Sequence, residues 1–241
     1  MLVAQGDLPE ALKSYHDGLA IADRLAKSDP DNAAWQRDLS VSYAEIGEVL
    51  VAQGNPPEAL KSYYDGLAII ERLVKSDSGN TRWQRDLLVS YVHVGDLQRA
   101  KDDLPEALNA YREALAIAER LVKADPNNSQ RQRDLRLCVG RIGNMAYYFI
   151  LAHQFDQALD TAEQAISHAS DKLWLQTNRA HALMFLGRTS EAREVYLSHR
   201  GERTQDDNWE TVIRADFAEL RKAGLSNPLM GEIESTFAIP Q

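Results

Sequence analysis

A 48-residue unit recurs along the chain and constrains its fold more than any other feature. The unit is clearest in residues 32–79, and its copies align without insertion over the first half of the sequence. A fixed period of this size is the signature of a protein built from stacked repeats. The positions that keep their residue type are Pro9, Pro57 and Pro105; Glu10, Glu58 and Glu106; Tyr15, Tyr63 and Tyr111; Asp38, Asp86 and Asp134; and Gly47, Gly95 and Gly143.

Each unit has the pattern of two amphipathic helices. In its first half, apolar side chains recur at intervals of three and four residues, which predicts a helix over about residues 33–53. The turn Gly54-Asn55-Pro56 should end it, because glycine suits the left-handed backbone after a helix and proline suits the first turn of the next. A second apolar stripe follows as far as Ser76. Neither helix can bury its stripe alone, so the sequence predicts an all-α fold of antiparallel hairpins that stack on one another.

Small and aromatic residues keep a fixed spacing in the two clearest units. They are Gly47, Ala59, Tyr63 and Gly66 in one, and Gly95, Ala107, Tyr111 and Ala114 in the next. In this respect the sequence resembles the tetratricopeptide repeat (TPR) family, whose usual unit has 34 residues. The longer unit is similar to the extended repeats of kinesin light chains and of many bacterial TPR proteins. The resemblance implies an α-α superhelix, that is, a solenoid of helix hairpins, and it extends over residues 1–201.

The resemblance divides the chain into a repeat array and a tail. We expect a leading second-type helix at 7–28, hairpins at 32–76, 80–124, 128–169 and 172–200, and capping helices in 202–241. Residues 1–6 align with the end of a first helix, 49–54. The leading helix therefore either lacks its hairpin partner or follows a segment further upstream, and we favour the second interpretation.

The spacing changes in the later hairpins. In the third, Ala158, Ala162 and Ala165 fit the pattern only if Ala146, three residues after Gly143, is the small first-helix residue. Three residues are therefore inserted near 140–144, and either a local bulge or a lengthened helix would absorb them. The last hairpin returns to the 34-residue spacing of the family.

Composition excludes several classes of function. A formal net charge of −9 and a pI near 5.2 disfavour nucleic acid, anionic membranes and acidic partners. No run approaches the roughly 18 apolar residues of a membrane span, and the N-terminal residues lack the pattern of a signal peptide, so we expect a cytoplasmic protein. The only cysteine, Cys138, excludes an internal disulfide and is expected to be a small buried residue.

The residues offer no catalytic or metal-binding constellation. None of the six histidines has the spacing of a zinc motif. The Asp-rich turns at 29–32 and 125–128 lack the glycine and glutamate of a calcium loop, so helix capping explains them better. We therefore predict a non-catalytic protein with no cofactor and no metal.

A pair of opposite charges follows each helix start: Arg37-Asp38, Arg85-Asp86 and Arg133-Asp134. These residues could form a charged ladder that faces a partner. Alternatively they are polar first-turn residues around a buried tryptophan, on a solvated or inter-repeat face. We favour the second interpretation, because a charge that recurs in every unit usually has that role.

The family resemblance also implies a concave groove lined by the first helices, in which partner peptides lie. The acidic and small residues at these positions lack the Lys and Asn set with which chaperone-binding TPR domains hold a C-terminal carboxylate. We therefore expect a protein or peptide partner with basic residues and apolar anchors. The groove positions carried over by spacing are Ala44, Glu48 and Val51; Val92, Asp96 and Arg99; Tyr147 and Ile150; and Thr177, His181 and Met184.

Three functional interpretations follow. The leading one is a scaffold of bacterial type that binds a peptide or helical segment in its groove. The second is a self-assembly module in which the unpaired leading helix docks on another copy to form a homo-oligomer. The third is the partner-binding half of a longer signalling enzyme.

Overall fold

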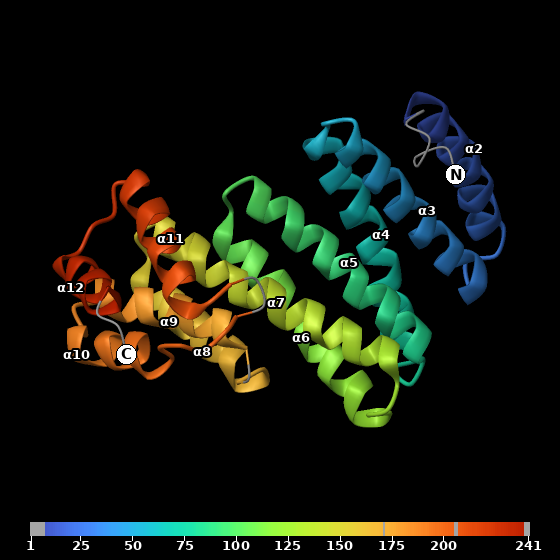
Figure 1. Cartoon of the computed structure of the whole chain (residues 1–241). Coiled ribbons are helices and arrows are strands. Elements are labelled where there is room, and N and C mark those ends of the chain that lie inside the picture. Colours follow the sequence, from blue (N-terminus) through green and yellow to red (C-terminus); the bar gives the residue numbers. More distant parts are fainter. Residues whose placement is uncertain (1–7, 171, 205–206, 239–241) are drawn as a thin grey trace. The chain divides into compact units, whose positions relative to one another are not determined.

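The computed structural model describes residues 8–170, 172–204 and 207–238, which form eleven helices and no strand (Figure 1). The expected end of a first helix at residues 1–6 lies outside this range. None of the described helices is both long and apolar enough to cross a membrane. The helices are α2 (Leu8–Ser28), α3 (Ala33–Ala52), α4 (Pro56–Ser76), α5 (Thr81–Ala100), α6 (Leu104–Ala124), α7 (Ser129–Leu151), α8 (Phe155–His168), α9 (Leu173–Phe185), α10 (Thr189–Ser198), α11 (Trp209–Lys222) and α12 (Pro228–Phe237).

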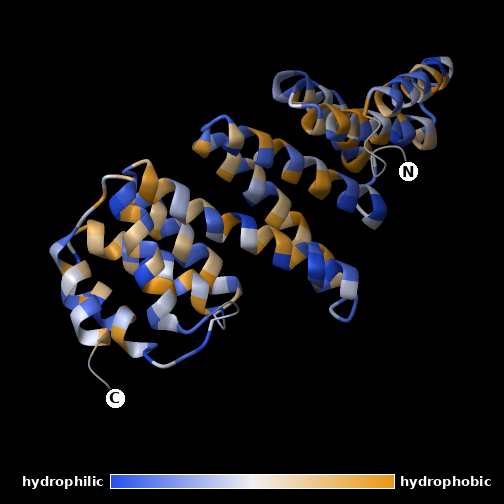
Figure 2. Cartoon of the chain, turned by 45° about the horizontal axis from the view of Figure 1, so that its top comes forward, coloured by the Kyte–Doolittle hydropathy of each residue, from blue (hydrophilic) through white to orange (hydrophobic). Residues whose placement is uncertain are grey.

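The chain forms two compact units, residues 1–138 and 139–241, with the division inside α7. In the first unit each helix from α2 to α5 packs against the next one along the chain, as a stack of hairpins requires (Figure 1). In the second unit α9 packs against both α8 and α10, and α12 contacts α10 and α11. Hydrophobic and hydrophilic residues alternate around the helices, as expected where one face of each is buried (Figure 2).

Asparagine caps begin the first helices of the repeats. The side chain of Asn32 accepts a hydrogen bond from the backbone N–H of Trp35 at 3.2 Å, and Asn80 accepts one from Trp83 at 3.1 Å. Such a cap satisfies a backbone donor that has no partner within the helix and is worth about 1 kcal/mol. The same asparagine in successive units therefore sets where each new hairpin starts.

A residue with a left-handed backbone conformation lies in the turn inside each of four hairpins. The sequence intervals between these residues equal the repeat lengths. Gly54, Asp102, His153 and Gly187 all have φ between 59° and 76°. The next residue in each case donates its backbone N–H to a carbonyl five residues earlier, which closes the preceding helix. The successive intervals between these four positions are 48, 51 and 34 residues. The turn predicted at Gly54 is therefore present.

A longer helix absorbs the three additional residues of the third hairpin. Helix α7 has 23 residues, whereas α3 and α5 have 20 each. Of the two expected ways to accommodate the insertion, the chain uses the lengthened helix. The insertion also changes what the recurrent glycine contacts. A Cβ on Gly47 or Gly95 would meet the ring of Tyr63 or Tyr111 in the same hairpin, but one on Gly143 would lie 2.3 Å from Leu175 of α9.

The repeated arginines and aspartates pair between successive units. Arg37 Nε donates to Asp86 Oδ2 at 2.6 Å, and Arg85 Nε donates to Asp134 Oδ2 at 2.8 Å. Asp134 is almost fully buried and also accepts from the Gln130 amide at 2.7 Å. These four side chains are thus part of an inter-repeat contact and do not present a free charged ladder. The neighbouring tryptophans, expected to be buried, are only half-buried.

Candidate partner-binding surface

In the first unit, the first helices α3 and α5 bring polar side chains from two repeats together. Glu48 of α3 is exposed, and its Oε1 lies 3.9 Å from Nε2 of His93 of α5. The imidazole of His93 packs on the ring of Tyr63, with 4.7 Å between the ring centroids. The Tyr111 hydroxyl of α6 donates to Asp96 Oδ1 of α5 at 2.6 Å. Tyr63 and Tyr111, both on second helices, thus contact polar side chains of the first helix α5.

The same acids affect the pKa values of neighbouring side chains. Burial, followed by the charges of Glu48 and Asp96, raises the pKa of the Tyr63 hydroxyl. Burial and the charge of Glu48 also raise the pKa of the Glu45 carboxyl. Glu45 was not among the groove positions predicted from sequence, although its position three residues before Glu48 places both side chains on one helical face. The carboxylates of Glu45, Glu48 and Asp96 are thus all at least partly accessible on this part of the surface.

The groove positions expected from sequence fall into two groups. Those at least partly accessible to solvent are Ala44, Glu48, Val51, Asp96, Arg99 and Tyr147, with Val51 43% exposed. Those buried in the structure are Val92, Ile150, Thr177, His181 and Met184. Because the side chains of the second group are at most 5% exposed, they serve packing and internal hydrogen bonds.

In the second unit, a hollow of about 380 Å³ is lined by residues of α7, α9 and α11. Three aromatic side chains contribute to it, and the Tyr147 and Tyr148 rings stand edge to face with centroids 6.4 Å apart. The polar groups of α9 are engaged internally, since Thr177 donates to the Trp174 carbonyl and Asn178 to the Gly143 carbonyl. The lining residues are Asn144, Tyr147, Tyr148, Trp174, Thr177, Asn178, Val212 and Asp216.

A buried histidine fixes the acidic residue of this hollow. His181 is fully buried, with Nδ1 2.7 Å from the Tyr196 hydroxyl and Nε2 3.2 Å from Asp216 Oδ2. An ionised carboxylate can only accept, so Nε2 carries a hydrogen, and in the neutral imidazole Nδ1 then accepts from the Tyr196 hydroxyl. Burial, then the charge of Asp216, raises the pKa of the Tyr196 hydroxyl well above its ordinary value. The network holds Asp216 in place while 30% of its side chain stays accessible.

Sequence reasoning missed Asp216 because the tail carries no repeat spacing and was expected only to cap the array. A signal was nonetheless present. Asp216 stands beside Phe217 and three residues after Ile213, at the edge of the apolar stripe of this helix. An acidic residue at such an edge lies close to the buried face, where a polar partner is required.

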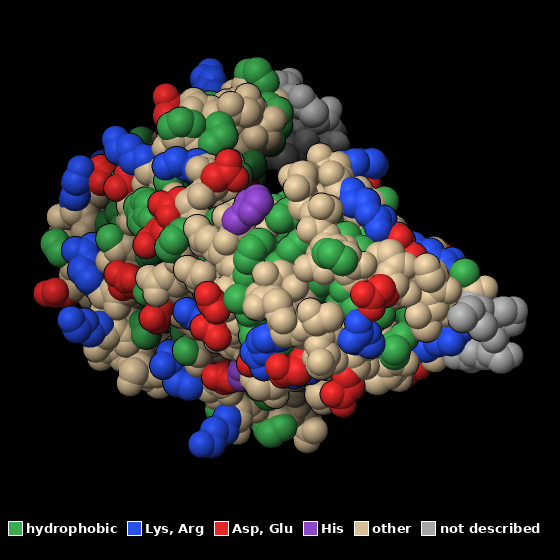
Figure 3. All heavy atoms as spheres, turned by 90° about the vertical axis from the view of Figure 1, so that its left-hand side faces the viewer, with side chains coloured by type: hydrophobic (Ala, Val, Ile, Leu, Met, Phe, Trp, Pro, Cys, Tyr) green, Lys and Arg blue, Asp and Glu red, His purple; other side chains and the backbone are tan. Residues whose placement is uncertain are grey.

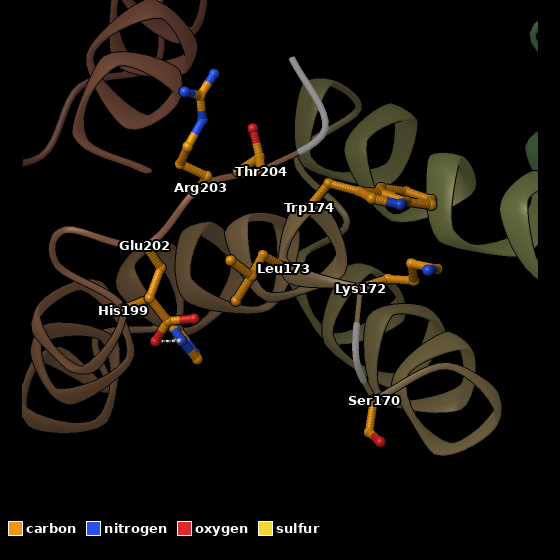
Figure 4. Close-up of a pocket in the computed structure, with 8 residues that line it drawn as sticks. All are labelled: Ser170, Lys172, Leu173, Trp174, His199, Glu202, Arg203 and Thr204. Carbon is orange, nitrogen blue, oxygen red and sulfur yellow. Dashed lines mark hydrogen bonds and ion pairs between the residues drawn. The ribbon is translucent and has the colours of Figure 1, made fainter. Parts of the chain in front are cut away.

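Trp174 also borders a second hollow of the same unit (Figure 4). There the His199 imidazole lies 3.2 Å from Glu202, and in Figure 4 the Trp174 ring points away from that pair. On the face drawn in Figure 3, acidic and basic side chains are interspersed. Among the described residues, no cluster of three His, Cys, Asp or Glu side chains is arranged to hold a metal ion.

Comparison with known proteins supports the sequence resemblance. Residues 41–120 match the family model of the tetratricopeptide repeat. A putative kinesin light chain from Podosopora anserina, with nearly identical TPR-like repeats, is 17% identical over 80% of this chain and 86% of its own, with a TM-score of 0.55. BtubC (BKLC) from P. vanneervenii is 16% identical over 95% of this chain and 87% of its own, with a TM-score of 0.54. No curated protein sequence matches the chain. These likenesses establish the shared fold.

Proposed function

We propose that this chain, a tetratricopeptide repeat protein with repeats of the kinesin light chain type, is a non-catalytic scaffold that binds a segment of a protein partner. The segment lies across the first helices, and residues 1–201 serve as the repeat array with 202–241 as its cap. One observation carries the proposal. Glu48 lies 3.9 Å from His93, whose ring packs on the Tyr63 ring. Burial, followed by the charges of Glu48 and of Asp96 from the next repeat, raises the pKa of the Tyr63 hydroxyl.

The chemistry of this surface favours a basic segment with apolar anchors. The carboxylates of Glu45, Glu48 and Asp96 favour lysine or arginine, while Ala44 and Val51 offer apolar contact on the same helix α3. An acidic segment would have to approach several carboxylates in a protein whose net charge is −9.

Binding of labelled helical peptides, measured by fluorescence anisotropy, tests this proposal. Two peptides of equal length and identical apolar anchors carry lysines in one case and glutamates in the other. We expect only the basic peptide to bind. The combined variant Glu48→Lys with Asp96→Asn should weaken it about tenfold, or about 1.4 kcal/mol, while Asn at position 96 still accepts from Tyr111.

The matched control is Asp65→Lys, which reverses an exposed charge on the second helix α4 and should leave the affinity unchanged. Equal binding of the acidic and basic peptides would refute the proposal. An unchanged affinity in the combined Glu48 and Asp96 variant would refute the location on α3 and α5.

A second candidate function, self-assembly through α2, is favoured by a difference between equivalent helices. The apolar side chain of Ile21 in α2 is 53% exposed, whereas the equivalent Ile69 of α4 and Ile117 of α6 are buried. Light scattering over a range of concentrations tests it. Assembly through α2 would be supported by a larger species that Ile21→Lys dissociates and Leu137→Lys does not. Leu137→Lys is the control, because Leu137 is also an exposed apolar side chain but lies outside α2. A monomer at every concentration would rule it out.

A further inference from the structure

The hollow of the second unit combines aromatic rings with one fixed carboxylate. Of the eight described residues that line it, three are aromatic, one is acidic and none is basic. Planar rings attract a cation over their faces, most strongly for tryptophan and least where water has free access. The rings of Tyr147, Tyr148 and Trp174 therefore give this hollow a preference that an aliphatic pocket would not have.

Asp216 supplies the negative charge, and a hydrogen bond to a buried histidine orients its carboxylate. One carboxylate oxygen is engaged by Nε2 of the buried His181 at 3.2 Å, and part of the side chain remains accessible in the hollow. The charges of Asp216 and Glu219, after burial, raise the pKa of the Tyr147 hydroxyl, so the negative potential of α11 reaches the aromatic wall. Helix α11 thus adds charge to a wall built by α7 and α9.

We propose that this hollow binds an arginine side chain of the protein partner, stacked on the aromatic wall and paired with Asp216. Arginine fits better than lysine, because the planar guanidinium stacks on rings and donates in a fixed fork to a carboxylate, and because it is more weakly hydrated than an ammonium group. An aliphatic or acidic side chain would bring no positive charge to the partly buried carboxylate of Asp216. This inference rests on the proposed scaffold function only in taking the arginine from a protein.

NMR titration with N-acetylarginine amide tests the inference on the intact protein. The readout is the indole N–H signal of Trp174, assigned by its loss in Trp174→Phe. We expect a saturable shift with N-acetylarginine amide, and at least tenfold weaker binding of the amide of N-acetylcitrulline, which keeps the planar group but has no charge. N-acetyllysine amide, with a free side-chain amine, should bind with intermediate strength.

Two variants locate the binding. Asp216→Asn should weaken the arginine compound at least tenfold, and it retains an oxygen that accepts from His181. Glu232→Gln removes a carboxylate of α12 that is paired with Arg193, away from the hollow, and should change nothing. Equal affinities for the arginine and citrulline compounds, or no effect of Asp216→Asn, would overturn the inference.

The outcome is separable from that of the peptide experiment on α3 and α5. If the small compound binds at Trp174 but basic peptides do not bind at all, the arginine site stands and the scaffold proposal fails. If basic peptides bind through Glu48 and Asp96 while the Trp174 signal does not move, the scaffold stands and the arginine site fails.

Discussion

Replacing Gly47 by alanine adds one methyl group between the two helices of a hairpin and so tests how tightly they pack. The glycine lies on α3 opposite the second helix of its own hairpin, and an added Cβ would stand 2.3 Å from Cε1 of Tyr63. Carbon atoms in favourable contact are about 3.5–4.0 Å apart. The ring or the helix would therefore have to move by more than about 1 Å.

The surroundings of Tyr63 leave little room for that movement. Its side chain is 6% exposed, and the His93 ring packs on it at 4.7 Å. Overpacking of this kind costs about 2–3 kcal/mol, while the better helix propensity of alanine returns about 1 kcal/mol. We therefore expect Gly47→Ala to lower the free energy of unfolding by about 1–2 kcal/mol, or the melting temperature by roughly 2–8 °C for a chain of this size.

Thermal unfolding followed by circular dichroism measures the effect, and the chain offers a matched control. Gly18 also lies inside a helix, but a Cβ there would meet nothing within 4 Å. Gly18→Ala should therefore stabilise the protein by up to about 1 kcal/mol. Tyr63→Leu combined with Gly47→Ala should cost less than the sum of the two single changes, because a smaller side chain accepts the methyl group. If Gly47→Ala stabilises as much as Gly18→Ala, the packing argument is wrong.

Two further predictions concern ion pairs. Arg85→Ala should lower the free energy of unfolding by about 2 kcal/mol, because it leaves Asp134, whose side chain is only 6% exposed, without its arginine. Arg37→Ala should lower it by about 1 kcal/mol, because its partner Asp86 is 22% exposed; equal losses in urea unfolding would contradict this difference. Arg221 donates twice to Glu234 at 2.8 Å and thereby lowers the pKa of that carboxyl. The Glu234 contribution to stability is therefore complete above the ordinary glutamate pKa of about 4.3 and lost as the pH falls below it; Glu234→Gln should destabilise at pH 7 and approach neutrality in acid, and a pH-independent difference would refute the assignment.

The sequence predicts the local structure of this chain well, because local structure depends on nearby residues. Asn32 and Asn80 mark helix starts through their own side chains, and Gly54 marks a turn through its own backbone freedom. The three-residue insertion was visible in the spacing of the small residues. Each of these signals acts over a few residues, and repetition at a fixed period makes it easier to detect.

Burial on the first helices was less predictable. Spacing places Thr177 and His181 at the same repeat positions as Ala44 and Glu48, yet the first two are buried. The difference arises from tertiary packing, since His181 meets Asp216 of the tail helix α11, which belongs to no repeat. The repeat spacing that assigns residues to a groove gives no information on a helix such as α11, which carries no repeat spacing.

The pairing of Arg37 with Asp86 and of Arg85 with Asp134 has a consequence for how such an array can grow. Donor and acceptor occupy adjacent positions in each unit, and each pair joins residues 49 positions apart, one more than the repeat. A tandem duplication of one whole 48-residue unit would therefore supply both partners of a new pair at the correct separation. A duplication that is not a whole number of units would leave an arginine and an aspartate without their partners. Lengthening by whole units therefore needs no compensating substitution at the new junction.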